Sequence, residues 1–188
     1  MTLKTFKYIF IVALLFSLNS CKGQTENSID RKTQTFNAKE FKVDFPKTKN
    51  EIELKENTAT TSGKGYVNVW SLKGADEHGP FVFEIFESPI TEERIAEIKK
   101  VPNTLNVIFI ATLMRFSDRF EGADFTSNEV KIDGYSGMQG ISKVFAGDGL
   151  IKSVIFRKDD KIYMVSAGGK GMKLNDTDKF INSFKFNK

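Results

Sequence analysis

Few residues of this chain have the types and spacing that catalysis needs. Among 188 residues there is one cysteine, Cys21, and one histidine, His78. Any Ser-His-Asp triad would have to use His78, which lies in the turn-like segment 76–80. A surface histidine in a turn is the simpler interpretation, with a catalytic base as the alternative. We therefore expect no catalytic residue.

Two further motifs fall short of the chemistry that they resemble. Gly134-Tyr135-Ser136-Gly137 is not a G-x-S-x-G nucleophile elbow, because position 138 is methionine. One histidine and one cysteine cannot build a zinc site. Asp176-x-Asp178 has part of a calcium-loop spacing but lacks the loop's glycine and terminal glutamate, so a helix cap explains it more simply. We expect no bound metal.

The remaining candidates are ambiguous. Residues 168–171, Gly-Gly-Lys-Gly, are either a small anion-binding nest or a flexible connection between a strand and a helix. Three aromatic residues either line a ligand cleft or belong to the core and sheet surface. They are Tyr66, Trp70 and Tyr163. The adjacent acid pairs at 92–93 and 159–160 do not face a common substrate as glycosidase carboxylates do. No cofactor is expected.

Cys21 stands at the border between an apolar and a polar stretch. Lys4 and Lys7 precede an apolar run over residues 8–18, and polar sequence begins directly after Cys21. A basic start, a short apolar run and a small residue before the cut are the parts of a secretory signal peptide. The run is shorter than the ~20 residues that a membrane-spanning helix needs. Residues 1–20 are therefore predicted to be a signal peptide.

The segment Leu18-Asn19-Ser20-Cys21 resembles the lipobox of a bacterial lipoprotein signal. The resemblance implies that Cys21 becomes the acylated, palmitate-bearing N-terminus of the mature protein. An ordinary signal peptide followed by a free thiol is the alternative. Stable anchoring takes more than one acyl chain, which a diacylated or triacylated cysteine provides. Lys22 is not the aspartate linked with inner-membrane retention, so the resemblance favours the outer membrane of the cell envelope, on its periplasmic or surface side.

The amino-acid composition of the chain limits the kinds of molecule that it can be expected to bind. The formal net charge of +4 falls to +2 when residues 1–20, with two lysines and no acid, are removed. Lysines alternate with acids along the rest of the chain, whereas nucleic-acid binding needs a clustered basic face. We therefore expect no nucleic-acid partner. The 18 phenylalanines supply large apolar side chains for a core.

Residues 21–35 are predicted to be a flexible tether between the lipid and one folded domain over residues 36–188. From residue 22 to 35 the only aliphatic side chain is Ile29, and no alternation appears. As a coil, a tether of this length spans roughly 20 Å, which would hold the domain near the membrane surface. A first strand is the alternative.

Alternation of apolar and polar residues predicts strands through most of the domain. The first four are expected to form an antiparallel meander, and four more follow in the last third of the chain. The segments are 41–46, 51–58, 65–72, 81–86, 128–132, 137–145, 150–157 and 162–167.

Three helices are predicted between and after these strands. Thr91 and the two acids after it favour a helix start, and Pro102 ends that helix. Residues 104–120 are apolar on nearly every side, which predicts a second, deeply buried helix; a membrane-inserting surface is the alternative. Asn175 or Asp176 is expected to cap a short C-terminal helix.

Four motifs, taken in order, resemble the PsbP-like (Mog-type) αβα sandwich family. They are Phe41-x-Val43-x-Phe45-Pro46, Val130-x-Ile132-Asp133-Gly134 followed by Gly137, Ile162-Tyr163-Met164-Val165, and Phe180-Ile181-Asn182-Ser183-Phe184. The resemblance covers most of residues 36–186. It implies a single α+β domain in which an antiparallel β-sheet is flanked by helices on both faces. It also implies a non-enzymatic accessory or binding role, and several bacterial members are lipoproteins.

The sequence thus predicts a lipid-anchored envelope protein that binds a protein partner as an accessory or assembly factor. The membrane contact would be made through the lipid on Cys21. Two alternatives remain. One is an envelope immunity protein that neutralises a toxin, and the other is a hydrolase that acts on envelope polymers through His78 or an acid pair.

Overall fold

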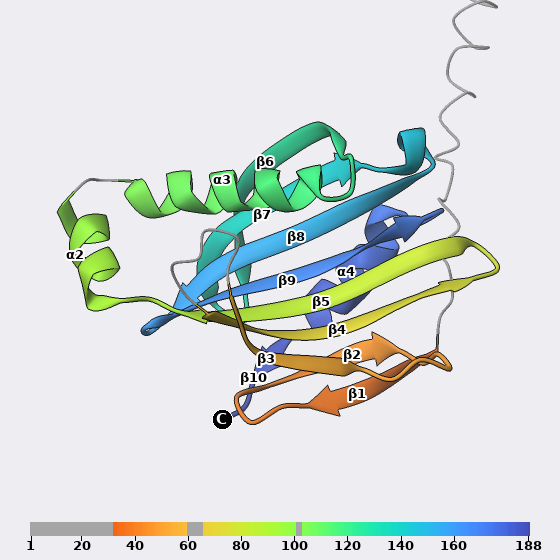
Figure 1. The fold of residues 1–188 in the computed structure, drawn as a ribbon, viewed down its shortest axis with the longest axis horizontal. Coiled ribbons are helices and arrows are strands. Elements are labelled where there is room, and N and C mark those ends of the chain that lie inside the picture. The colour runs from red at the N-terminus through yellow and green to blue at the C-terminus, as the bar shows by residue number, and fades with distance from the viewer. Residues whose placement is uncertain (1–31, 60–65, 101–102) are drawn as a thin grey trace, which may run out of the picture.

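The computed structural model describes residues 32–59, 66–100 and 103–188, and strands dominate these ranges (Figure 1). Of the described residues, 54% are in strands and 25% in helices. In chain order the elements are β1 (Thr33–Asn37), β2 (Phe41–Pro46), β3 (Glu53–Ala59), β4 (Tyr66–Asp76), β5 (Gly79–Pro89), α2 (Glu92–Lys100), α3 (Thr104–Asp118), β6 (Ala123–Ile132), β7 (Tyr135–Lys143), the 3-10 turn η1 (Phe145–Gly147), β8 (Gly149–Lys158), β9 (Lys161–Lys170), α4 (Leu174–Ser183) and β10 (Lys185–Phe186).

The strands form two antiparallel sheets. The large sheet has seven strands in the order β3-β4-β5-β9-β8-β7-β6, and the small sheet has three in the order β1-β2-β10. Tight turns connect neighbouring strands: Asp133 and Gly134 join β6 to β7 with φ of 47° and 87°, and Asp159 has φ of 54° between β8 and β9. Such left-handed residues match the twist of two-residue hairpins. These turns separate the strands that the sequence predicts at 128–132, 137–145, 150–157 and 162–167.

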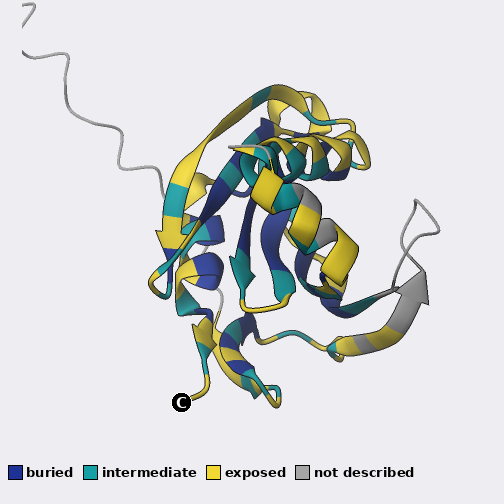
Figure 2. Ribbon diagram, turned by 90° about the vertical axis from the view of Figure 1, so that its left-hand side faces the viewer, coloured by how far each residue is buried: buried dark blue, intermediate teal, exposed yellow. Residues whose placement is uncertain are grey.

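One face of the large sheet packs against the small sheet and α4. Alternate residues of β5 point to this face, as they do in any strand. The buried core there is largely aromatic, and Figure 2 shows the buried residues in dark blue along the central strands of the large sheet. Its fully buried rings include Phe41, Phe45, Phe156, Tyr163 and Phe184.

The other face is covered at one end by α3, which packs on β7 and β8. Phe109, Leu113 and Phe116 of α3 are buried against the sheet. They meet Val82 of β5 and Ile155 of β8 in a second, smaller core. The central strands of the large sheet are therefore buried on both faces.

The predicted α+β class, with its αβα sandwich, is wrong. The described residues form a β-rich fold of two antiparallel sheets with only three α-helices. The prediction failed because of how the two ends of the domain pair. The strands within residues 33–46 pair with each other and with β10, and they do not join the large sheet. A second sheet therefore covers part of the face that helices were expected to cover.

Several element predictions are also corrected. The segment 41–46 is a strand, but it belongs to the small sheet and not to the meander of β3, β4 and β5. The strand β1 begins at Thr33, inside the last residues of the expected tether. The C-terminal helix begins at Leu174, and Asp176 acts from within its first turn, where its Oδ2 accepts a hydrogen bond from the Lys173 N–H at 2.9 Å.

The apolar segment 104–120 is largely helical, as predicted, but it is not buried all round. Leu113 is 2% exposed, whereas Met114 and Val107 are 48% and 64% exposed. Only the face toward β7 and β8 is packed, because no described element lies over the opposite face. Within the three described ranges, no helix has the length and apolarity needed to cross a bilayer.

Candidate functional site

The residues that the sequence singled out are mostly dispersed. Cys21, the predicted signal peptide and most of the tether lie outside the described residues. His78 is exposed in the β4–β5 turn, where its backbone N–H donates to Asp76 Oδ1 at 2.9 Å. Ser136 lies near the start of β7, beside the turn at Asp133. The structure does not bring these residues together.

The glycine-rich segment 168–171 is not a free loop. Its first three residues end β9, and only Gly171 has a positive φ, of 69°. The Gly171 N–H donates to the carbonyl oxygen of Asp148, so it is already used within the chain. Residues 168–170 therefore hold an extended strand rather than the anion nest considered above.

The aromatic candidates belong to the core instead of a cleft. Trp70 packs edge-on against Phe41 with ring centroids 5.0 Å apart, and Tyr163 is 1% exposed. The side chain of Tyr66 lies outside the described residues. Trp70 and Tyr163 thus share a buried cluster, as the core alternative expected, and they do not line a ligand cleft.

The acidic candidates are separated as well. Glu92 and Glu93 are exposed in the first turn of α2, and residues 159–160 form the β8–β9 turn. Asp178 pairs with Lys152, with 2.5 Å between Oδ1 and Nζ. Among the described residues, no group of three or more His, Cys, Asp or Glu side chains could hold a metal ion.

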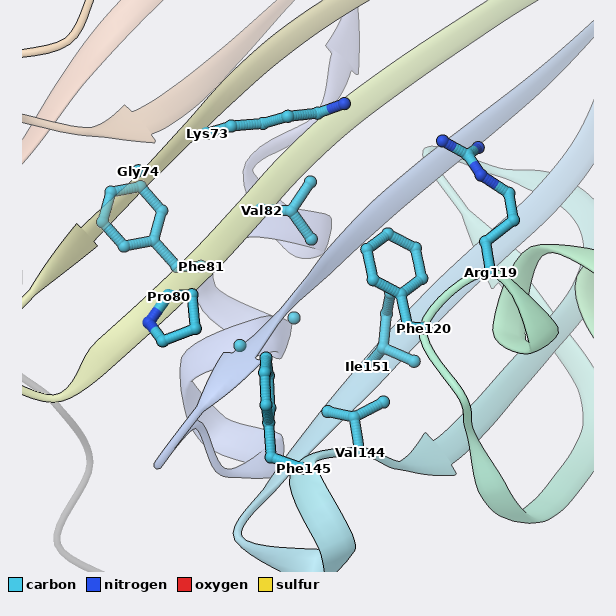
Figure 3. A pocket seen from close by; sticks show the side chains of 12 residues that line it. Lys73, Gly74, Pro80, Phe81, Val82, Arg119, Phe120, Val144, Phe145 and Ile151 are labelled. Atoms are coloured by element: carbon cyan, nitrogen blue, oxygen red, sulfur yellow. The ribbon is translucent and has the colours of Figure 1, made fainter.

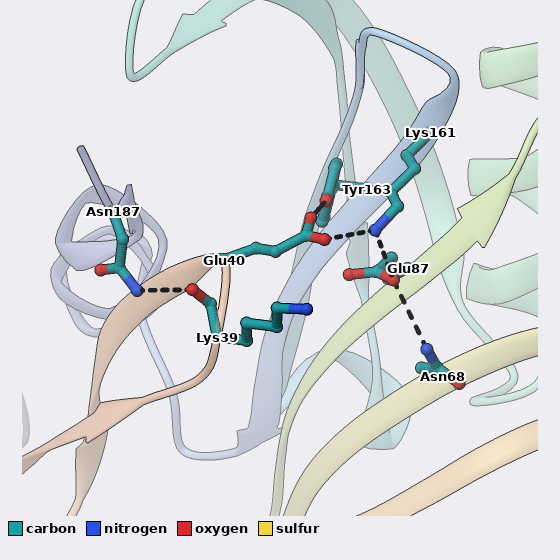
Figure 4. A network of polar contacts seen from close by, with 7 residues as sticks. All are labelled: Lys39, Glu40, Asn68, Glu87, Lys161, Tyr163 and Asn187. Carbon is teal, nitrogen blue, oxygen red and sulfur yellow. Dashed lines mark hydrogen bonds and ion pairs between the residues drawn. The ribbon is translucent and has the colours of Figure 1, made fainter.

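A polar cluster that the sequence did not reveal joins the two sheets (Figure 4). We call it the Glu40 cluster. The Lys161 ammonium donates to Glu40 Oε1 at 2.6 Å and to Glu87 Oε1 at 3.1 Å. The Tyr163 hydroxyl donates to Glu40 Oε2 at 2.5 Å. Because Glu40 directly precedes β2 and the others lie on β5 and β9, the cluster ties the small sheet to the large one.

The surroundings hold Glu40, Lys161 and Tyr163 each in one charge state. The hydrogen bond from Lys161, followed by that from Tyr163, lowers the pKa of Glu40. Burial, followed by the hydrogen bond to Glu40, raises the pKa of Tyr163. Burial opposes the charge of Lys161, but its bonds to Glu40 and Glu87 outweigh burial and raise its pKa. Since an acid–base catalyst needs a pKa near the working pH, the cluster fits a structural clamp.

A cavity opens at one end of the large sheet, on the face that α3 covers. We call it the end cavity; it lies where the β4–β5 turn, the end of β9, η1 and the end of α3 meet (Figure 3). Its volume is about 400 Å³. Its lining consists of Lys73, Gly74, Pro80, Phe81, Val82, Arg119, Phe120, Val144, Phe145, Ile151, Gly168 and Gly169.

The floor of the end cavity is a row of residues from four adjacent strands. Lys73 is opposite Val82, Val82 is opposite Gly168, and Gly168 is opposite Ile151. Residues directly opposite each other in a ladder share a face of the sheet. Gly168 has no side chain, and a Cβ atom there would lie only 2.7 Å from Ile151 Cγ1. Ile151 therefore packs directly over Gly168, and the floor of the cavity is formed by Val82, Ile151 and the backbone of Gly168.

The wall is built from the end of α3. The Ser117 hydroxyl donates to Ser142 Oγ at 2.6 Å, in a buried bond that fixes the last turn of α3 to β7. The chain then folds back, because the Gly122 N–H donates a hydrogen bond to the Ser117 carbonyl oxygen. This fold-back places Arg119 and Phe120 beside the cavity.

Phe145 forms the opposite wall from η1. It is 44% exposed and has φ of 52°, and Ala146 after it also has φ of 52°. A left-handed conformation costs a residue with a side chain roughly 1–2 kcal/mol. A large exposed aromatic side chain held in this conformation at a cavity mouth indicates a functional position.

Two cationic groups lie at one side of the end cavity. Figure 3 shows the Lys73 ammonium and the Arg119 guanidinium pointing toward each other. Lys73 pairs with Glu84 at 2.7 Å, and the Glu84 side chain is 1% exposed on the same sheet face as Val82. Arg119 lies over the rings of Phe116 and Phe120, 5.1 and 5.7 Å from their centroids. The end cavity therefore combines an apolar interior with positive charge.

Comparison with known proteins does not assign this site. No family model matches the chain. No curated protein is significantly similar to it. The PsbP-like resemblance thus remains a likeness of short sequence motifs.

Sequence reasoning missed the end cavity because its residues come from distant segments. Two local signals pointed toward it. Glu84 is the only polar residue in the apolar strand segment 81–86. Phe145 is a large aromatic residue beside the glycine-rich turn 147–149, where polar residues are usual.

Proposed function

We propose that this protein is a lipid-anchored, non-enzymatic binding protein of the cell envelope, acting as an accessory or assembly factor. The observation that carries the binding role is the end cavity, which is open, mostly apolar and rimmed by two cations. Such a cavity, with few polar groups, is typical of a binding site. Its described lining offers two cations and several apolar groups, which can bind and orient a molecule.

The anchor in this proposal rests on the sequence around Cys21. The lipobox-like segment supports acylation of Cys21 and, with Lys22 after it, location at the outer membrane. The strand β1 begins at Thr33, so only residues 22–32 separate Cys21 from the folded domain. Fully extended, a segment of that length spans at most roughly 40 Å, which keeps the domain close to the membrane.

The proposal is tested by acyl labelling of full-length protein in cells. A clickable palmitate analogue should label the wild type but not Cys21→Ser, and globomycin should block processing of the wild type. The variant should leave the outer-membrane fraction. Membrane retention that is the same with and without Cys21 would contradict the proposal.

A second test concerns the binding role. Phe145→Asp should prevent an envelope partner from co-purifying with the full-length protein, because it puts a charge into the apolar wall. Met114→Asp, at an exposed position of α3 outside the cavity, is the matched control and should retain the partner. Equal recovery with both variants would contradict a binding role for the cavity.

A further inference from the structure

We infer that the end cavity binds an amphipathic anion. An apolar chain or ring would lie on the floor between Val82 and Ile151, and a carboxylate or phosphate would lie between Lys73 and Arg119. The ligand class rests on the proposed binding role but not on the acylation of Cys21.

The size and lining of the cavity fit a small ligand. Its volume of about 400 Å³ lies within the range of roughly 300–1,000 Å³ that is usual for small-molecule sites. Phe120, which follows α3, and Phe145, from η1, both line the cavity (Figure 3). Aromatic walls around an apolar floor favour an aliphatic chain or a ring over a strongly hydrated molecule.

The charge balance favours an anion. Among the described residues, Glu84 is the only carboxylate paired with Lys73, and Arg119 has no carboxylate partner. Two cations and one acid leave a net positive charge at this side of the cavity. An ammonium has three donors and a guanidinium has five, so both groups can bind a ligand while they keep their present contacts. Arginine is especially suited to carboxylates and phosphates, because its donors form a planar fork.

Glu84 holds the Lys73 ammonium in position through an ion pair. It is buried, and its Oε1 pairs with Lys73, while Oε2 has no hydrogen-bond partner among the described residues. A buried acceptor of this kind is normally satisfied by an ordered water or by a ligand donor. Because an ionised carboxylate headgroup has acceptors only, Oε2 would take an ordered water, and Glu84 serves to hold Lys73 at the side of the cavity.

The place of the cavity in the molecule favours a lipid-derived ligand. The strand β1 begins at the same end of the molecule as the β4–β5 turn and η1 (Figure 1). Thr33 lies there beside Phe83 of β5 and Asp176 of α4. If Cys21 is acylated, residues 22–32 join the anchor to this end, where β1 begins. The mouth of the cavity would then lie within reach of membrane lipids or of fatty acids released from them.

Photolabelling tests the inference on the full-length acylated protein in nanodiscs of neutral phosphatidylcholine. The probe is decanoate carrying a diazirine, and labelled residues are located by mass spectrometry. We expect labels on residues of the cavity lining. Unlabelled decanoate and decyl phosphate should compete at least tenfold better than decanol, which has the same chain without the charge.

Three variants make the test specific. Arg119→Gln should weaken competition by decanoate about tenfold, since it removes one charged contact. Phe145→Gly should also weaken it, and because glycine accepts the positive φ, this variant should keep the wild-type melting temperature. Arg115→Gln is the matched control, because Arg115 is exposed one turn earlier on α3 and does not line the cavity.

The outcomes separate the possible sources of the ligand. Loss of label when phosphatidylglycerol replaces part of the neutral lipid indicates a membrane lipid, and persistence of label indicates a free amphiphile; both support the inference. Scattered labels, equal competition by decanol, or equal effects of Arg119→Gln and Arg115→Gln would overturn it. If labels are scattered while partner binding still depends on Phe145, the ligand class is wrong but the proposed function stands.

Discussion

Tyr163 combines core packing with a hydrogen bond to a charged group. Its ring is buried among aromatic neighbours, and its hydroxyl donates to Glu40. Tyr163→Phe should keep the packing and lose the bond, which should lower the free energy of unfolding by about 1 kcal/mol. Urea denaturation measures the change. Tyr135→Phe is the control, since the Tyr135 hydroxyl has no partner in the described part of the chain, and equal losses in both variants would contradict the clamp.

Glu40 should make part of the stability depend on pH. Its folded-state pKa is lowered from the ordinary value of 4.5, so near that pH the folded protein binds fewer protons than the unfolded chain. The resulting stabilisation is present above about pH 4.5 and is lost as the pH falls through the folded-state pKa. Glu40→Gln should therefore be less stable than the wild type at pH 7. The difference should narrow at acid pH in urea titrations, and a difference that grows there would contradict this assignment.

Individual residues also show the limits of sequence-based site prediction. His78 and Asp176 are residue types that can serve in catalysis or metal binding. In the structure His78 lies in a surface turn, and Asp176 lies in the first turn of a helix. Arg119 and Lys73 lie in no sequence motif that would have marked them as binding residues. Their relation depends on the register of β4 with β5 and on the fold-back after α3, and both are properties of the folded chain.

At the level of elements, α3 is a helix with one packed face, although its sequence is apolar on most sides. Leu113→Ala should lower the free energy of unfolding by about 2–5 kcal/mol, because it leaves a cavity against β7. Met114→Ala, one residue along the same helix, should change it by less than about 0.5 kcal/mol. Chemical denaturation of both variants is the measurement. Similar large losses would show that the exposed face of α3 is covered after all.

Strands were easier to predict from the sequence than their arrangement. Turn residues such as those at 133–134 and 158–161 mark hairpins locally, so β7, β8 and β9 were predicted to within three residues at each end. The strand β6 begins five residues before its predicted start at residue 128. The strand β1 was missed because four of its five residues are exposed, and an exposed edge strand need not alternate. The sheet to which β2 belongs could not be predicted, because β2 pairs with residues 185–186 at the far end of the chain.

At the level of the whole molecule, the C-terminus closes the small sheet onto the large one. The Phe186 N–H donates to Asp133 Oδ2, and its ring contacts Tyr135, Tyr163 and Phe184. Removal of residues 185–188 should lower the free energy of unfolding by about 2 kcal/mol or more, because aromatic surface becomes exposed. Removal of Lys188 alone is the control and should have little effect. Thermal and urea unfolding of the two truncated chains give the comparison.

The proposed lipid anchor on Cys21 and the end cavity are expected to act together in partner binding. The most direct test is photo-crosslinking in intact cells, with benzoylphenylalanine placed at Phe145 or, as the control, at the exposed position Val107. We predict a discrete crosslinked product from position 145, no product from position 107, and loss of the first product when Cys21→Ser is added. Equal products from both positions, or an undiminished product from position 145 without Cys21, would contradict the claim.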